Sequence, residues 1–250
     1  MIQNIFHTAI YQPIYNALAA LVSVVPGADV GIAIILLTIL VKLILLPLSL
    51  VAVRSQMAMQ EIDPELKRLR KDLKGKPEEL ARQTMALFKE KKVKPFASIL
   101  LVFVQLPVII GLYFVFLKEG SGAGFDPALL YAFISVPSTV SFNFLSFIDL
   151  TSASIVLAFL VAASQFVASS LVLPKPAAKT NDEGPSFQSD FARSMHIQMR
   201  YVFPVIIGII AYVISAAIAL YFLVSNLFAI GQELYVRRVR AQKQPTAGSV

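Results

Sequence analysis

The chain has 250 residues, 57% of them hydrophobic, and a mean hydropathy of +0.72. Soluble domains are about 45–50% apolar, so this composition indicates an integral membrane protein. Cysteine is absent and only two histidines occur, which excludes disulfides, thiol catalysis and cysteine-based metal sites and disfavours a His-rich one. The formal net charge of +7 is informative mainly through its distribution along the chain.

The first 30 residues are apolar and hold no Lys or Arg, so they lack the basic start of a signal peptide. We predict an interfacial helix on the outer face of the membrane, at Ile10–Val25, although Pro13 interrupts the apolar run. Pro26-Gly27 then turns the chain into the first span.

Four apolar blocks follow, and a membrane-spanning helix needs roughly 20 apolar residues. They are Gly31–Val53, with Lys42 as its one charge, Phe96–Leu117, Leu150–Leu173 and Tyr201–Gln232. Basic loops mark the cytoplasmic side. Residues 54–95 hold 12 Lys/Arg, residues 118–149 hold only Lys118, and both flanks of the fourth block are basic. The fourth block must therefore cross twice, with a tight outer turn near Ser215–Ala217.

The predicted fold is all-α, with five transmembrane helices, the N-terminus outside and the C-terminus in the cytoplasm. Its segments are an interfacial helix within 1–30, spans at 31–53, 96–117, 150–173, 195–214 and 215–236, a cytosolic helical hairpin at 54–95, an outer loop at 118–149, a flexible cytosolic loop at 174–194 and a basic cytosolic tail at 237–250.

The basic segment 54–95 has an internal helical pattern. Asp63-Pro64 is typical of an N-cap followed by proline at the first helical position, which would restart a helix there. Apolar residues then follow a spacing of three and four, and Gly75–Pro77 interrupts it before a second helix over Glu78–Lys92. We predict a hairpin that projects into the cytosol; a solvated linker that happens to be helical is the alternative.

Lys42 lies near the middle of the first span, where a charge that faces lipid costs a few kcal/mol or more. No Asp or Glu occurs in the four apolar blocks, so we expect water in a cavity beside the ammonium. Backbone carbonyls released by Pro47 are the alternative partner. Neutral polar residues in the spans fit either helix–helix contacts or a water-filled groove; those we select for the groove are Thr38, Ser164, Gln165 and Asn226. Pro47, Pro107 and Pro204 are expected to kink three spans and help to open it.

No span carries a carboxylate pair, a metal-binding set, a phosphate-binding loop or a Ser–His arrangement. We therefore predict no catalytic residue, no metal and no cofactor, and a protein that is not an enzyme.

Several stretches resemble the YidC/Oxa1/Alb3 family of membrane protein insertases, in the same order over about residues 20–236. They are GIAIILLTILVKLILLPLSL (31–50), Met57-Ala58-Met59-Gln60 with Asp63-Pro64-Glu65, VKPFASILLVFVQLPVIIGLY (93–113), FIDL (147–150) and YFLVSNLFAIGQ (221–232). The resemblance implies a five-span core with a cytosolic hairpin, in a shorter form without a large periplasmic domain. It implies insertion of nascent membrane proteins into the membrane without nucleotide hydrolysis. The lack of a transit peptide predicts a bacterial plasma membrane rather than an organelle.

The resemblance also implies roles for individual residues. Lys42 matches the groove's usual arginine, Gln105 matches a glutamine of the second span, and Tyr221 and Phe222 match an aromatic pair along the substrate's path. The hairpin residues expected to capture a chain or partner are Met57, Met59, Asp63 and Pro64. The implied partners are nascent membrane proteins, lipid, the ribosome and a Sec translocon, with no specific nucleic acid.

Three departures from the family pattern stand out. Lysine replaces arginine at position 42, Ser215 and Ala217 stand where a Pro-Ala-Gly turn is common, and the basic tail is short. Two other functions remain open at this point. One is a transporter or channel that uses Lys42 as an anion site, and the other is an assembly chaperone that folds spans without inserting them.

Overall fold

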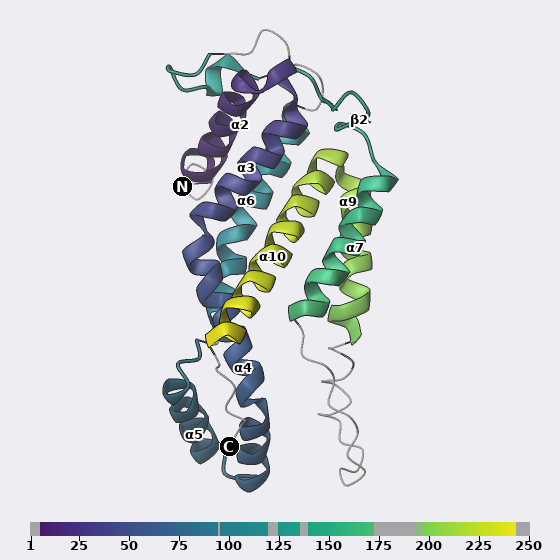
Figure 1. Ribbon diagram of the computed structural model, residues 1–250. Helices are drawn as coiled ribbons and strands as arrows, with labels where there is room; N and C mark the ends of the chain where they lie inside the picture. The colour runs from purple at the N-terminus through teal and green to yellow at the C-terminus, as the bar shows by residue number, and fades with distance from the viewer. Residues whose placement is uncertain are drawn as a thin grey trace. The chain divides into compact units, whose positions relative to one another are not determined.

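The structure is a computed structural model that describes residues 6–94, 96–119, 125–135, 140–172, 194 and 197–243 (Figure 1). The described residues are mostly helical. The chain divides into two compact units, of which the first comprises Met1–Leu43 and Leu106–Gly231 and the second comprises Ile44–Gln105 and Gln232–Val250.

The first unit contains most of the apolar helices. Its elements are the π-helical turn η1 (His7–Tyr11), α2 (Gln12–Val24), η2 (Pro26–Ala28), α3 (Val30–Ile44, up to residue 43), α6 (Ala97–Glu119, from residue 106), η3 (Pro127–Leu129), β1 (Asn143–Phe144), β2 (Ile148–Asp149), α7 (Ile155–Val172), the π-helical turn η4 (Gln198–Val202), α9 (Phe203–Ile214) and α10 (Ala216–Lys243, up to residue 231).

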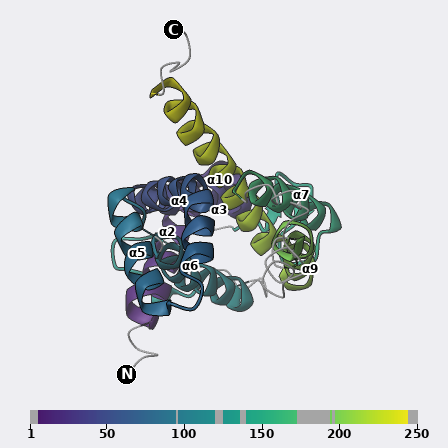
Figure 2. The same cartoon turned by 90° about the horizontal axis from the view of Figure 1, so that it is seen from below.

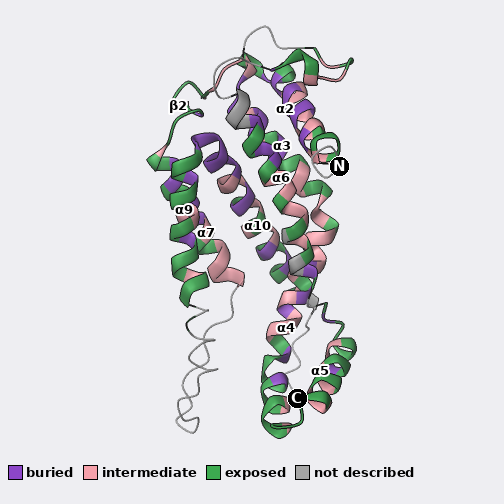
Figure 3. Ribbon diagram, turned by 180° about the vertical axis from the view of Figure 1, so that it is seen from behind, coloured by how far each residue is buried: buried purple, intermediate pink, exposed green. Residues whose placement is uncertain are grey.

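Helix α2 is part of the packed interior of this unit. Its Tyr15, Ala19 and Val22 are all 0% exposed and belong to one apolar cluster with Ile34 of α3 and Leu112 of α6. Figure 3 shows the buried residues running along the faces of α2 and α3 that point into the unit. The predicted helix near the N-terminus is therefore present, and it packs against the apolar helices; its position at a membrane surface stays a prediction.

Polar contacts connect the start of α3 to the β1–β2 hairpin in the first unit. Asp29 precedes α3 and its carboxylate accepts hydrogen bonds from the N–H groups of Gly31, Ile32 and Leu145. The first two bonds cap the helix, and the third attaches the antiparallel β1–β2 hairpin to it. Loop and helix are thus fastened together by one buried carboxylate.

Helices α7 and α9 lie side by side in two perpendicular views (Figures 1 and 2). Their approach depends on small residues, because a Cβ at Gly208 would lie 2.9 Å from the Cβ of Ala162 and 3.3 Å from the carbonyl oxygen of Ala158. The outer faces of both helices are exposed and apolar, for example Phe159 at 71% and Ile209 at 57% (Figure 3). Close packing through small residues with apolar outer faces is typical of helices in lipid.

The second unit contains α4 (Leu46–Asp72), α5 (Pro77–Glu90), the first residues of α6 and the end of α10. Helices α4 and α5 form a hairpin whose turn includes Gly75 at φ +88°, a conformation that favours glycine. Ile62 and Leu66 of α4 pack with Leu87 of α5 and Val93 in an apolar cluster. A helical hairpin is present in this segment, and its location in the cytosol stays a prediction.

Among the described residues, two helices are long and apolar enough to cross a membrane, Ile155–Val172 and Ala216–Gln242. A third results if Val30–Ile44 and Leu46–Asp72 are taken together as one broken span. Two shorter apolar helical stretches occur at Phe103–Val115 and Gln198–Ile214. All five predicted spans thus contain helix, but five crossings stay a prediction.

Three sequence predictions about prolines have different outcomes, and the first needs correction. Asp63-Pro64 does not restart a helix, because α4 runs without interruption from Leu46 to Asp72 with Pro64 inside it. The irregularity expected at Pro47 is present, since α3 ends at Ile44 and α4 begins at Leu46 with Pro47 in its first turn, so the first span consists of two consecutive helices. Pro204 lies inside the helical stretch Gln198–Ile214, in the first turn of α9 and directly after the π-helical turn. A π turn inside a helix is rare and is one of the recognised causes of a kink.

The last helix also differs from its prediction, which ended the span at residue 236. Helix α10 continues to Lys243, so the predicted basic tail is largely helical as far as the structure describes it. The predicted flexible loop at 174–194, apart from residue 194, and the final residues 244–250 lie outside the described residues.

Candidate functional site

The predicted groove residues of the first unit come from α3, α7 and α10. Thr38 and Lys42 lie one turn apart on α3 and so share a face of the helix. Thr38 is 1% exposed, and its hydroxyl donates a 2.7 Å hydrogen bond to the carbonyl oxygen of Ile34. Lys42 is half-buried in the last turn of α3. Lys42 is therefore more accessible than Thr38, which is fully inside the unit.

A second polar pair joins α7 to α10. The side-chain amide of Asn226 donates a 3.1 Å hydrogen bond to the hydroxyl oxygen of Ser164, and both residues are 8% exposed. The Ser164 hydroxyl in turn donates to the carbonyl oxygen of Val161. Gln165 follows Ser164 and is half-buried. Two of the predicted residues are thus brought into direct contact, as an interhelical hydrogen bond inside an apolar unit.

The aromatic pair on α10 is split between interior and surface. Tyr221 is 1% exposed and belongs to the main apolar cluster, whereas Phe222 is only partly buried beside it. Their ring centroids are 5.7 Å apart with an edge-to-face arrangement. Of the two, Phe222 is the one with surface left for another molecule to contact.

The remaining predicted site residues belong to the second unit. Gln105 is half-buried on α6. Met57 is buried and Met59 packs against the apolar cluster of the hairpin, while Asp63 and Pro64 are exposed on α4. Met57 is buried and Met59 is half-buried, so Asp63 and Pro64 are the most accessible members of the predicted capture set.

Sequence reasoning missed the residue that fastens α2 in place. Asn16 is 1% exposed, and its amide donates to the carbonyl oxygens of Gln12 at 2.8 Å and Leu129 at 2.9 Å while its oxygen accepts from the N–H of Tyr131 at 2.6 Å. The available signal was an amide within an apolar helical run, the same kind of irregularity that drew attention to Lys42.

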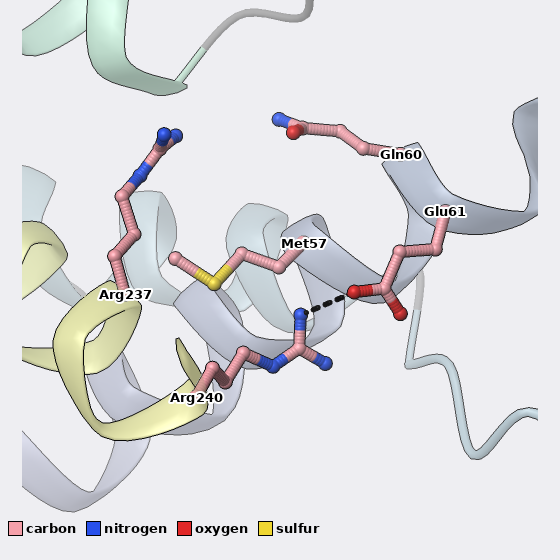
Figure 4. Close-up of a pocket in the computed structure, with 5 residues that line it drawn as sticks. All are labelled: Met57, Gln60, Glu61, Arg237 and Arg240. Atoms are coloured by element: carbon pink, nitrogen blue, oxygen red, sulfur yellow. Dashed lines mark hydrogen bonds and ion pairs between the residues drawn. The ribbon is translucent and has the colours of Figure 1, made fainter. Parts of the chain in front are cut away.

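Sequence reasoning also missed a pocket in the second unit that is lined mainly by polar side chains. Its lining residues are Met57, Gln60 and Glu61 of α4 and Arg237 and Arg240 of α10 (Figure 4). The signal in the sequence was weak, because the two arginines look like ordinary members of a basic tail. Within the described residues no group of three His, Asp or Glu side chains gathers as a metal site.

Apolar helices long enough to cross a membrane, with polar side chains buried between them, define an integral membrane protein with an internal polar site. The family model described as 60Kd inner membrane protein matches residues 21–244. The chain therefore belongs to this family of bacterial inner membrane proteins, whose curated relatives carry the name membrane protein insertase YidC. The resemblance seen in the sequence is confirmed.

Three relatives with that name illustrate the similarity. The protein of Clostridium tetani is 31% identical over 214 residues, covering 86% of this chain and 84% of the relative. The protein of Clostridium perfringens is 44% identical over 126 residues, 50% of this chain and 52% of the relative. The protein of Paraburkholderia phymatum is 30% identical over 87% of this chain, which corresponds to 34% of that longer relative.

Proposed function

We propose that this protein inserts newly made membrane proteins through a hydrophilic groove in its first unit, without nucleotide hydrolysis. Membership of the insertase family supports the activity. The observation that carries the groove is a set of buried polar side chains among apolar helices, Thr38, Ser164 and Asn226, with the Lys42 ammonium one turn beyond Thr38. Gln165 is added to the groove from the sequence pattern alone, and the role that the sequence resemblance implies for Gln105, which belongs to the second unit, stays a prediction.

The proposed mechanism begins with the hydrophilic tail of a substrate, which enters from the cytoplasm and is attracted to Lys42 when it is acidic. Water and neutral polar groups reduce the cost of removing that tail from bulk solvent. The apolar segment of the substrate then moves past Phe222 into lipid. Its burial drives the process at about 25 cal/mol per Å² of apolar surface.

The same proposal includes five spans with the N-terminus outside and the C-terminus in the cytoplasm. It places the hairpin of α4 and α5 in the cytosol, where a nascent chain, the ribosome or a Sec translocon can reach it. The excess of basic residues in that segment supports this side of the membrane.

The charge at position 42 is tested by insertion into vesicles that contain the purified protein. Lys42→Ala should reduce insertion of a single-span substrate with an acidic tail roughly fivefold, about the effect of one ion pair in water-like surroundings. Lys42→Arg should keep most of the activity, because the charge is retained. The amount of protease-protected substrate measures the outcome.

Two controls separate local attraction from general effects. Lys74→Ala removes the same charge at an exposed position and should leave insertion unchanged. A substrate whose acidic tail residues are replaced by their amides should lose its dependence on Lys42. Equal insertion by Lys42→Ala and the unchanged protein would reject the attraction mechanism, and anion flux that depends on Lys42 would favour a transporter.

A further inference from the structure

The end of α10 and the middle of α4 line an open pocket of about 310 Å³ in the second unit (Figure 4). Met57, Gln60 and Glu61 enter it from α4, and Arg237 and Arg240 enter it from α10. The two helices are also joined by the Ser49 hydroxyl, which donates a 3.0 Å hydrogen bond to the side-chain oxygen of Gln232.

One arginine of the pocket is held by a buried acid. Glu233 is 4% exposed, and its carboxylate accepts a 2.8 Å hydrogen bond from Nε of Arg237 one turn later on α10. This pairing neutralises the buried carboxylate and restricts the direction of the guanidinium. Arg237 is therefore a positioned cation and not a freely moving surface side chain.

The other arginine holds a carboxylate that can be exchanged. Nη1 of Arg240 lies 2.9 Å from Oε1 of Glu61, with side chains 38% and 60% exposed. Exposed ion pairs of this kind contribute little to stability. A guanidinium recognises any carboxylate through the same fork of N–H donors, so Glu61 shows which chemical group this position accepts.

The net positive charge of the chain lies in the second unit. Residues 44–105 and 232–250 together hold sixteen Lys/Arg and eight Asp/Glu, a net +8, while the rest of the chain carries −1. An acidic segment of a polypeptide is drawn to such a surface before it meets any particular residue.

We propose that this pocket is the first docking site for the acidic tail of a substrate, where a side-chain carboxylate of the tail replaces Glu61 at Arg240. The proposal rests on the proposed insertase function and adds a step before the groove. The exchange leaves Arg240 paired with one carboxylate, while the displaced Glu61, whose side chain is 60% exposed, turns to solvent. The buried thioether of Met57 gives the pocket an apolar wall for the methylene groups of the incoming side chain.

The test uses the purified full chain in neutral micelles and a fluorescent hydrophilic 12-residue peptide with one central Glu, compared with its Gln version. Glu61→Gln should tighten binding of the Glu peptide roughly threefold, because it removes the internal competitor, and Arg240→Gln should weaken it by a similar factor. Binding of the Gln peptide should change in neither variant. Fluorescence anisotropy gives the dissociation constants.

A second ion pair in the same unit provides the matched control. Arg82 and Glu79 of α5 form an exposed ion pair, with 2.8 Å between Nη2 and Oε2. Neither residue lines the pocket. Hydrogen bonds from Gln83 and Arg82 hold the pKa of Glu79 below its ordinary value, so this carboxylate is charged at neutral pH. Glu79→Gln and Arg82→Gln make the same changes in net charge and should leave binding of the Glu peptide unchanged.

If the substitutions at Glu79 and Arg82 change binding of the Glu peptide as much as those at Glu61 and Arg240, the proposal is overturned, because attraction would then depend only on net charge. Displacement of the peptide by phosphatidylglycerol, with equal binding of the Glu and Gln peptides, would identify a lipid headgroup site and overturn it as well. Lys42→Ala separates the two proposals, since it should reduce insertion of acidic tails roughly fivefold whether or not the pocket distinguishes the Glu peptide from the Gln peptide. If the Glu and Gln peptides bind equally well while Lys42→Ala lowers insertion, the docking site is rejected and the groove is retained.

Discussion

At the scale of single residues, buried polar side chains determine how the first unit is held together. Asn16 uses both donors of its amide and its oxygen in hydrogen bonds to main-chain groups of α2 and of residues 129–131. Asp29 does the same for the start of α3 and Leu145. Each joins a helix to a loop more than 100 residues away, since Asn16 and Leu129 are 113 positions apart and Asp29 and Leu145 are 116 apart.

We expect Asn16→Leu to destabilise the protein by about 1–3 kcal/mol, because it removes the hydrogen-bond partner of half-buried main-chain groups of Leu129 and Tyr131. The change keeps a similar volume, so the loss would not come from a cavity. Thermal unfolding followed by circular dichroism in micelles measures it. Asn143→Leu makes the same substitution at an exposed position and should change stability by less than about 0.5 kcal/mol.

At the scale of elements, tertiary packing overrides local signals in α4. A proline inside a helix costs about 3 kcal/mol, and Asp63-Pro64 is a good start signal, yet α4 continues through both. Ile62 and Leu66 on either side of Pro64 are buried against Leu87 of α5, and this packing stabilises the unbroken helix. Because Pro64 itself is exposed, its ring displaces no core residue.

The close contact between α7 and α9 at Gly208 predicts that an alanine is tolerated less well there than at Gly231, which is outside that contact. Gly208→Ala should destabilise the protein by about 1–3 kcal/mol, because the new methyl group would lie 2.9 Å from the Cβ of Ala162. Gly231→Ala on α10 meets no atom within 4 Å and should be neutral or stabilise by up to about 1 kcal/mol. Melting temperatures of the two variants decide it, and equal shifts would contradict close packing at Gly208.

At the scale of the whole molecule, charge is divided along the chain in a way that predicts its orientation. The second unit carries a net +8 and the first a net −1. Since basic segments stay on the cytoplasmic side, the hairpin of α4 and α5 and the end of α10 are expected there. The β1–β2 hairpin is expected on the opposite side.

The absence of native cysteine makes this orientation directly measurable. A single cysteine at Phe147, which is 90% exposed in the turn between β1 and β2, should react with an impermeant maleimide added to intact cells. A single cysteine at exposed Lys74 should react only after the membrane is opened. Labelling of both positions in intact cells would contradict the proposed topology.

The sequence alone was sufficient for the family, the mostly helical fold, the apolar blocks and the unusual position of Lys42. These features depend on composition, local periodicity and the order of motifs, all of which can be read without knowing which helices touch. The same local signals predicted a wrong helix start at Asp63-Pro64, where packing against α5 prevailed.

Only the tertiary structure decided which polar residues meet. Asn226 binds Ser164 across 62 positions, Asn16 binds Leu129 across 113, and Arg240 binds Glu61 across 179. No local pattern encodes such pairs, because each depends on the register with which two distant segments pack. The physical reason is that burial makes an unpaired polar group costly, so packing selects partners from the whole chain rather than from nearby sequence.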